Sequence, residues 1–159
     1  MDALLELLQE NARESADILA KELGTSVDDV EKRINEYLEE GVIRAFKAII
    51  NEDKLETSDV RAVIELRIQP HKDCGFDTIA TRISQFEEVE SLFLMSGAYD
   101  LLLFVKGKSL QAVAGFVNTR LATIDGVLST ATHFMLKTYK DQGVLMESDN
   151  NDERLQVSP

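Results

Sequence analysis

The feature that most constrains this fold is a pair of helical patterns separated by a glycine, in residues 15–43. Apolar residues recur at helical spacing up to Gly24 and again after Ser26, and Gly41 ends the second pattern. Two short helices that meet at a glycine turn pack crosswise, which is the outline of a helix-turn-helix. In such a unit the second helix usually lies in the major groove of DNA. The pattern therefore predicts a DNA-binding module.

The flanking residues extend this module to a three-helix unit over residues 1–51. A first helix is expected over residues 3–10, with its leucines turned inward. At the start of the third helix, the Ser26 hydroxyl is expected to accept from the amide of Asp29, whose carboxylate reaches back as a shortened capping box. Residues 44–51 alternate imperfectly and are interpreted as a strand that leaves the module.

The second half of the chain, residues 60–139, follows a polar linker at 52–59 and repeats strand and helix patterns. Its first strand alternates clearly, with apolar residues on one face: Val60, Ala62, Ile64, Leu66 and Ile68. A turn between Pro70 and Gly75 leads to the first helix, and residues 127–139 form the last strand. The order βαββαβ predicts a ferredoxin-like α+β domain, in which two helices cover one face of an antiparallel four-stranded sheet.

The other face of this sheet is left uncovered by the predicted topology. An apolar sheet face without a cover is normally buried against a second copy of the chain, so the second half predicts a dimer. The remaining residues, 140–159, are polar and acidic and are expected to form a flexible tail.

The net charge of the chain, -12, works against DNA binding, because phosphate binding depends on Lys and Arg. Residues 1–50 hold 12 acidic and 6 basic side chains, a local net charge of -6. However, remote carboxylates are screened over a Debye length of about 8 Å at physiological salt. A basic edge can therefore still bind DNA.

Composition and length bound the class of protein. The 159 residues are 44% hydrophobic and 29% charged, as in a soluble globular protein with one ordinary domain or two small ones. No apolar run approaches the ~18 residues that span a bilayer, and the acidic start is unlike a signal peptide. The single cysteine excludes an intrachain disulfide. We expect a cytoplasmic protein with no membrane partner.

Several local motifs carry a resemblance to a known family. In the first half they are Asn11-Ala12-Arg13, Leu19-Ala20, Gly24-Thr25-Ser26, Arg33, Leu38 and Gly41-Val42-Ile43; in the second half they are Gly97-Ala98-Tyr99-Asp100, Gly126-Val127, Thr130 and Thr132. With the order of elements, this pattern resembles the Lrp/AsnC family of amino-acid-responsive transcription regulators over residues 1–144. The resemblance implies a winged helix-turn-helix followed by a βαββαβ domain of the RAM/AsnC type.

The resemblance also implies how such a protein works. Members form homodimers through their sheet domains, often assemble further into octamers, and bind an amino acid between dimers near a turn and the last strand. Effector binding there alters assembly and so DNA affinity. The residues expected to bind the effector are Gly97, Ala98, Tyr99, Asp100, Thr130 and Thr132.

Elementary chemistry is consistent with this effector site and leaves an alternative open. Asp100 and the two threonine hydroxyls can receive the ammonium group of a zwitterion, while backbone amides near Gly97 can donate to its carboxylate. Alternatively these residues serve the turn itself, with Gly97 supplying a positive φ and Asp100 capping the hairpin.

The candidate DNA-binding residues are Arg13, Ser26, Lys32, Arg33, Asn35 and Arg44. We expect Ser26 and Lys32 near the groove, Asn35 at a base edge, and the arginines at the backbone or flanking the reading helix. An alternative for Arg33 is a structural ion pair with Asp29 or Glu36 on its own helix. The sequence departs from the family pattern at Val27-Asp28-Asp29 and Asn35-Glu36, because small, polar or basic residues are more usual at these positions.

Two rival functions follow from these observations. An acidic co-regulator would keep the sensing domain and the helix-turn-helix scaffold but contact protein instead of DNA. An enzyme has little support, because the only histidines are His71 and His133, and the sequence has no metal-ligand cluster, nucleophile with a nearby base, or glycine-rich phosphate loop. We therefore expect no catalytic residue, no metal and no cofactor other than an amino-acid effector.

Overall fold

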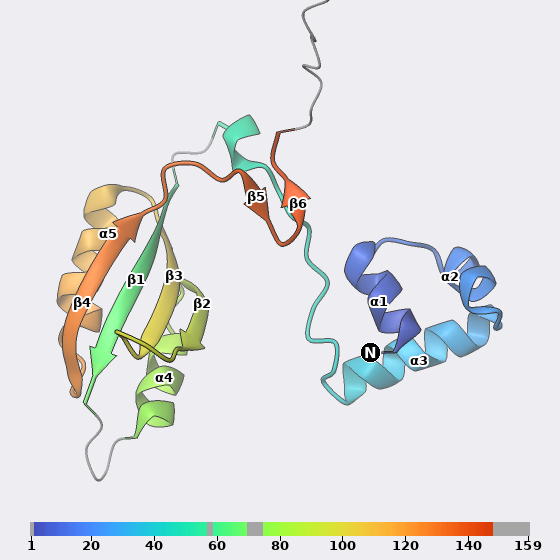
Figure 1. The fold of residues 1–159 in the computed structure, drawn as a ribbon, viewed down its shortest axis with the longest axis horizontal. Helices are drawn as coiled ribbons and strands as arrows, with labels where there is room; N and C mark the ends of the chain where they lie inside the picture. Colours follow the sequence, from blue (N-terminus) through green and yellow to red (C-terminus); the bar gives the residue numbers. More distant parts are fainter. Residues whose placement is uncertain (1, 57–58, 70–74, 148–159) are drawn as a thin grey trace, which may run out of the picture. The chain divides into compact units, whose positions relative to one another are not determined.

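A computed structural model of the chain describes residues 2–56, 59–69 and 75–147 (Figure 1). The chain divides into two compact units, residues 1–50 and 51–159, and each is described by itself. The predicted turn at 70–75 therefore lies outside the described residues except for Gly75, as do His71 and the last twelve residues of the predicted tail. Within the described ranges, no helix is long and apolar enough to cross a membrane.

The first unit contains the three predicted helices, α1 (Ala3–Glu10), α2 (Ala16–Leu23) and α3 (Val27–Glu39). The predicted bounds of α1 are confirmed. Leu4, Leu19 and Val30, one from each helix, are fully buried and form the centre of a small core. Because each helix presents a single apolar stripe, the three helices can share this core and leave their other faces in water.

The caps of the helix-turn-helix follow the sequence with one correction. Gly24 ends α2 in the left-handed region at φ 64°, and the Asp29 amide donates to Ser26 Oγ over 3.2 Å, as predicted. The Asp29 carboxylate does not reach back to the Ser26 amide. It accepts instead from the Thr25 hydroxyl at 3.0 Å, because its side chain is one methylene shorter than the glutamate of a full capping box.

The strand predicted for residues 44–51 is absent, which is a second correction. These residues form neither helix nor strand, and none of the described strands pairs with them. Alternating side chains alone do not make a strand, because a ladder of hydrogen bonds to a neighbour is also required. Beyond this segment, Glu52–Lys54 form a short 3-10 helix, η1, in the predicted linker.

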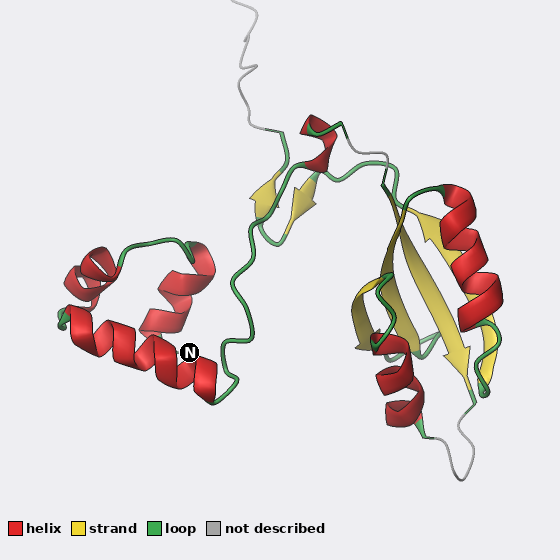
Figure 2. Ribbon diagram, turned by 180° about the vertical axis from the view of Figure 1, so that it is seen from behind, coloured by secondary structure: helices red, strands yellow, loops and turns green. Residues whose placement is uncertain are grey.

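The second unit has the predicted βαββαβ order. Its elements are β1 (Val60–Ile68), α4 (Phe76–Ser84), β2 (Val89–Leu94), β3 (Leu101–Gly107), α5 (Leu110–Phe116), continued by the π-helix η2 (Val117–Leu121), and β4 (Val127–Phe134). The sheet order is β2-β3-β1-β4 and every pairing is antiparallel. Figure 2 shows α4 and α5 on the same face of the sheet, as predicted.

Alternation along the strands places the core between the sheet and these helices. Ala62, Ile64 and Leu66 of β1 are fully buried, and their β3 partners across the ladder, Val105, Leu103 and Leu101, are buried with them. The helices add the other core residues: Ile79, Ile83, Val113, Phe116, Val117, Leu121 and Ile124. The predicted apolar face of β1 is confirmed, and neither α4 nor α5 covers the opposite face of the sheet (Figure 2).

The C-terminal part differs from the prediction. The last sheet strand ends at Phe134 instead of residue 139, and the first residues of the predicted flexible tail form a hairpin of β5 (Lys140–Asp141) and β6 (Val144–Leu145). Gln142 and Gly143 at its turn both have positive φ, 44° and 90°, as in a two-residue type I′ turn. These two residues therefore form a turn that allows a hairpin, although the polar composition of the segment predicted a flexible tail.

Candidate functional site

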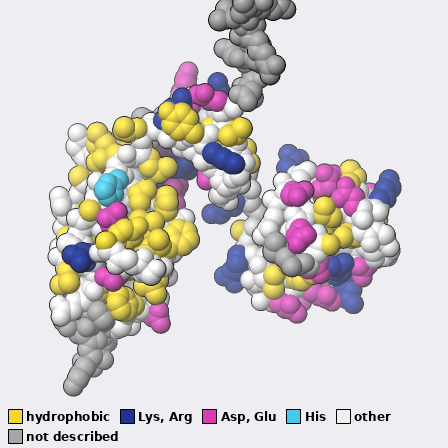
Figure 3. All heavy atoms as spheres, viewed as in Figure 1, with side chains coloured by type: hydrophobic (Ala, Val, Ile, Leu, Met, Phe, Trp, Pro, Cys, Tyr) yellow, Lys and Arg dark blue, Asp and Glu magenta, His cyan; other side chains and the backbone are white. Residues whose placement is uncertain are grey.

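The surface of α3 carries a continuous polar stripe made of Asp28, Glu31, Lys32 and Asn35. These residues are spaced at i, i+3, i+4 and i+7, so they lie on one face of the helix, and all four are exposed. Val30, on the opposite face, is fully buried in the unit's core. We call this face the reading stripe, since it is the part of a helix-turn-helix that meets DNA. Figure 3 shows acidic and basic side chains interspersed over this unit.

Arg33 follows Lys32 in the chain but points away from the stripe and is engaged within the protein. Its Nη2 donates to both carboxylate oxygens of Asp2, at 2.7 and 2.8 Å, and the Tyr37 hydroxyl donates to the same carboxylate at 2.8 Å. The Tyr37 hydroxyl, the Leu4 amide and the Arg33 guanidinium together lower the pKa of Asp2 below its usual value. This cluster ties the start of α1 to the middle of α3.

The structural alternative for Arg33 therefore has direct support, although its main partner was not predicted. The Asp29 carboxylate is 3.7 Å from Arg33, while Glu36 pairs with Lys32 at 3.6 Å instead. The sequence did not indicate Asp2 as the partner, because it is 31 positions away from Arg33 in the chain. The only signal in the sequence was an aspartate directly before the first helix, which also serves as the cap of α1.

The other candidate DNA-binding residues lie at the surface of the first unit. Arg13, Ser26 and Arg44 are exposed, in addition to the two members of the stripe. Ser26 already accepts the Asp29 amide, so a DNA phosphate would share this hydroxyl with the helix cap. The structure brings Lys32 and Asn35 together on the stripe and leaves Arg13 at the turn between α1 and α2.

The predicted effector turn connects β2 to β3 at one end of the sheet. Asp100 Oδ2 accepts the Ile68 amide at 2.7 Å, and the Asp100 amide donates to the Leu66 carbonyl at 2.9 Å. Asp100 thus fastens the turn to the end of β1, which supports the alternative that it caps the hairpin. Gly97 has φ 139°, a backbone conformation that side chains rarely adopt.

The two threonines reach the same end of the sheet from the other side of β1. Thr130 lies opposite Leu66 and Thr132 lies opposite Ile64 in the ladder between β1 and β4. Leu66 is therefore flanked by Asp100, which bonds to its carbonyl, and by Thr130. The structure thus brings the turn and the first threonine to neighbouring strands, with both threonines partly exposed.

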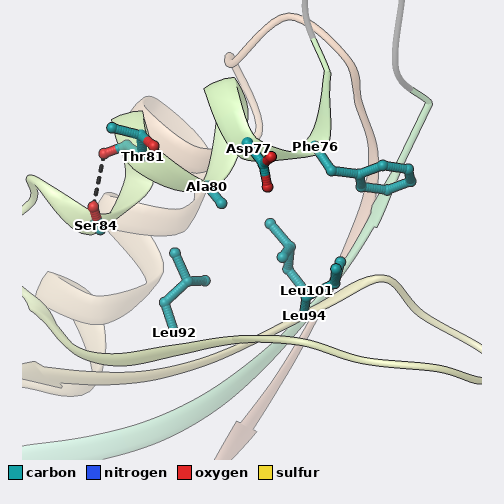
Figure 4. Close-up of a pocket in the computed structure, with 8 residues that line it drawn as sticks. All are labelled: Phe76, Asp77, Ala80, Thr81, Ser84, Leu92, Leu94 and Leu101. Carbon is teal, nitrogen blue, oxygen red and sulfur yellow. Dashed lines mark hydrogen bonds between the residues drawn. The ribbon is translucent and has the colours of Figure 1, made fainter.

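A pocket beside this turn was not predicted from the sequence. It is an open hollow of about 250 Å³ between α4 and β2, lined by Phe76, Asp77, Ala80, Thr81, Ser84, Leu92, Leu94 and Leu101. None of the six predicted effector residues lines it. Figure 4 shows the leucines on one side and the polar residues of α4 on the other, with the Ser84 hydroxyl bonded to the Thr81 carbonyl at 2.8 Å. Leu94 and Leu101 pair across the ladder at the base of the turn. The sequence places Asp77, Thr81 and Ser84 at i, i+4 and i+7 on one face of α4, but nothing in this spacing distinguishes a pocket from an ordinary polar helix face.

The uncovered side of the sheet is the third candidate surface, which we call the open face. Its residues are Arg61, Val63, Glu65 and Arg67 of β1, Ser91 and Phe93 of β2, Leu102, Phe104 and Lys106 of β3, and Ser129, Ala131 and His133 of β4. The rings of Phe93 and Phe104 meet edge to face, with centroids 6.2 Å apart. Apolar side chains are gathered on this side of the sheet in Figure 3.

Charged residues border the apolar centre of the open face. Arg61 pairs with Glu90 at 3.2 Å and with Glu52 of η1 at 3.1 Å, and Lys106 pairs with the same Glu52 at 3.0 Å. His133 Nε2 is 3.5 Å from Glu65. An apolar centre with a charged rim is the usual composition of an interface between proteins. Among the described residues, no group of three or more His, Cys, Asp or Glu is arranged to hold a metal ion.

A helix-turn-helix followed by an α+β domain with a pocket and an open sheet face is the composition of a two-domain, DNA-binding regulator. Comparison with known proteins agrees. Residues 3–44 match the model of a winged helix-turn-helix DNA-binding domain, and residues 61–145 match that of the Lrp/AsnC ligand binding domain. The chain belongs to the Lrp/AsnC family and is a DNA-binding transcriptional regulator.

Individual relatives span nearly the whole chain. The uncharacterized HTH-type transcriptional regulator YugG of Bacillus subtilis (strain 168) is 42% identical over 157 residues, which is 98% of this chain and 95% of its own. The proline dehydrogenase transcriptional activator of Rhizobium radiobacter is 26% identical over 89% of this chain and 90% of its own. These names describe transcriptional regulators and give no support to the rival enzyme.

Solved structures show the same architecture. The complex of the transcriptional regulator NMB0573 from Neisseria meningitidis with L-Met has a TM-score of 0.70 and 26% identity, and the match covers 89% of this chain and 93% of that one. E. coli AsnC has a TM-score of 0.65 and 25% identity over 87% of this chain and 93% of its own. The predicted resemblance and fold class are thereby confirmed.

Proposed function

We propose that this regulator works as a homodimer, assembled through the open face, which binds an amino acid beside the turn at 95–100 and couples its occupancy to DNA binding. The proposal rests on the position of the pocket at the base of this turn, since Leu94 and Leu101 line the pocket and also flank the turn. A ligand there contacts Leu94 and Leu101, which flank the turn that Asp100 fastens to β1. Binding can therefore change the conformation of the turn at this end of the sheet.

An amino acid with an apolar side chain suits this pocket best. Leucines and Phe76 line one side, while Asp77 and the hydroxyls of Thr81 and Ser84 line the other. A zwitterion needs both kinds of surface, because its charged end requires polar partners and its side chain gains by leaving water. The Neisseria meningitidis relative was solved with L-Met, so methionine is the first effector to test.

Thermal unfolding of the full chain with each of the twenty amino acids tests the effector. A ligand at about 100 times its dissociation constant adds about 2.7 kcal/mol to the free energy of unfolding, because it binds only the folded chain. We expect a rise in the melting temperature with methionine or another apolar amino acid. An unchanged melting temperature with all twenty would remove the amino-acid effector.

Asp100 does not line this pocket, so two of its substitutions test whether the ammonium group lies instead at the turn itself. They also separate such a contact from the hydrogen bond between Asp100 and Ile68. Asp100→Asn retains an oxygen that accepts the Ile68 amide but loses the negative charge, whereas Asp100→Ala loses both. If Asp100 binds the effector, the asparagine variant keeps its melting temperature without ligand and loses the response to it. If Asp100 only fastens the turn, the asparagine variant responds as the wild type does.

The acidic co-regulator stays the second candidate, because Asp28 and Glu31 are exposed on the stripe that would face phosphates. A shift assay with promoter DNA of the chain's own gene, repeated across salt concentrations, separates the two functions. Direct DNA binding predicts that the affinity falls steeply with salt, by about 0.9 logarithmic units per decade for each phosphate contacted. Absence of any shift at low salt would favour contacts with protein.

A further inference from the structure

We infer that the carboxylates of the reading stripe select cytosine in the operator, and that they exclude other sequences by repulsion. This inference rests on the DNA binding of the family and deepens it, since it assigns the base that particular side chains recognise. It begins with the composition of the stripe, in which Asp28 and Glu31 precede Lys32 and Asn35. The two carboxylates thus occupy the N-terminal half of α3, the part of a reading helix that contacts base edges.

The surroundings of α3 leave these two carboxylates available. The third acidic residue of this half, Asp29, accepts from Thr25 and lies near Arg33, so it belongs to the cap and the core side of the helix. Within the described part of the chain, the carboxylates of Asp28 and Glu31 form no hydrogen bond or ion pair. They are exposed, whereas Arg33, the nearest arginine on the helix, is held by Asp2.

The chemistry of the major groove then determines which base a carboxylate accepts. Cytosine presents the N4 amino group, a donor, and a carboxylate can accept from it. Adenine also presents an amino donor, but its N7 acceptor lies beside it and repels the second carboxylate oxygen. Guanine and thymine present acceptors at these positions. An Asp or Glu in the groove therefore favours cytosine over the other three bases.

Repulsion from phosphates adds a second effect of the same residues. Each carboxylate opposes the electrostatic attraction on which sequence-independent binding depends. At a cognate site, the hydrogen bond to cytosine offsets this repulsion. At other DNA sequences no such hydrogen bond forms, so the repulsion is not offset. The stripe accordingly weakens binding to random DNA more than binding to the operator, which is consistent with the net charge of -6 in this unit.

Selection from a random double-stranded DNA library with the full-length protein tests the inference. The variants are Asp28→Asn and Glu31→Gln, which keep size and polarity but remove one charge each. Glu10→Gln serves as the matched control, because Glu10 is an exposed residue at the end of α1, outside the stripe. Circular dichroism confirms that each variant retains the helical content of the wild type.

We expect wild-type protein and the Glu10 control to select half-sites that contain cytosine, preferred by about 5-fold to 150-fold over other bases at a contacted position. At least one stripe variant should lose this preference at one position and shift it toward adenine, since Asn and Gln pair with adenine N6 and N7. It should also bind random DNA more tightly than the control does.

Three results would overturn the inference. A wild-type motif without cytosine, or stripe variants that select the wild-type motif unchanged, would show that the carboxylates read no base while DNA binding itself stands. Failure of the wild type to enrich any sequence would remove direct DNA reading, and this inference with it.

Discussion

Replacing Phe93 with alanine should weaken the pairing of two copies through the open face. Phe93 lies on β2, its side chain is 50% exposed, and its ring meets that of Phe104 edge to face. A face-to-face pairing of two sheets would remove this exposed half from water in both copies, because a two-fold interface uses the same patch twice. Truncation therefore acts twice in each dimer.

The size of the effect follows from the area involved. A phenylalanine side chain has roughly 200 Å² of surface, so the exposed half amounts to about 100 Å² per copy and about 200 Å² per dimer. At about 25 cal/mol per Å², complete loss of this burial costs about 5 kcal/mol. Alanine retains part of the contact, so we expect about 2 to 5 kcal/mol, which raises the dimer dissociation constant about 30-fold to 4,000-fold.

Sedimentation equilibrium over a range of concentrations measures this change directly. Leu110→Ala is the matched control, because Leu110 is 49% exposed but lies at the start of α5, on the helix-covered side of the sheet. The control should have the dissociation constant of the wild type. Equal dissociation constants for the Phe93 variant and the wild type would refute the proposal that the open face pairs the copies.

Three further predictions concern stability. Gly126→Ala should lower the free energy of unfolding by about 1–3 kcal/mol in a denaturant titration, because φ at Gly126 is 90° and the new Cβ would lie 2.9 Å from Ile79 Cδ1. Gly115→Ala is the control and should not lower it, because a Cβ there meets nothing within 4 Å. Leu4→Ala should cost about 2–5 kcal/mol, since Leu4 is fully buried, and a change below 1 kcal/mol would contradict this core. The Tyr37 hydroxyl, the Leu4 amide and Arg33 lower the pKa of Asp2 below 3.8, so the ionised carboxylate stabilises the folded chain above that pH and this stabilisation is lost as the pH falls through the folded-state pKa. The melting temperatures of the wild type and Asp2→Asn should therefore become equal at low pH. A difference that stays constant with pH would count against the cluster.

Local patterns were sufficient to predict most of the fold. Gly24 and Ser26 determine where α2 ends and α3 begins, since one residue permits a left-handed conformation and the other caps a helix. The alternation of β1 likewise identifies its buried face before any partner strand is known. These features depend on a residue and its near neighbours, which is why the sequence alone predicts them.

The features that sequence reasoning missed depend on residues far apart in the chain. Asp2 captures Arg33 across 31 positions, and the pocket needs α4 to lie over a particular edge of β2. The segment 44–51 was predicted as a strand from its own side chains, although strand formation requires a partner. For the effector turn, the sequence identified Asp100 but could not show that one of its oxygens binds the Ile68 amide.

The mass of the wild-type protein in solution tests directly whether two copies of the chain pair. One chain has a mass of 17.8 kDa. In sedimentation equilibrium at micromolar concentration, pairing through the open face predicts species of twice this mass or an even multiple of it, with a distribution that changes when the effector is added. A single species with the mass of one chain, with or without amino acids, would contradict it.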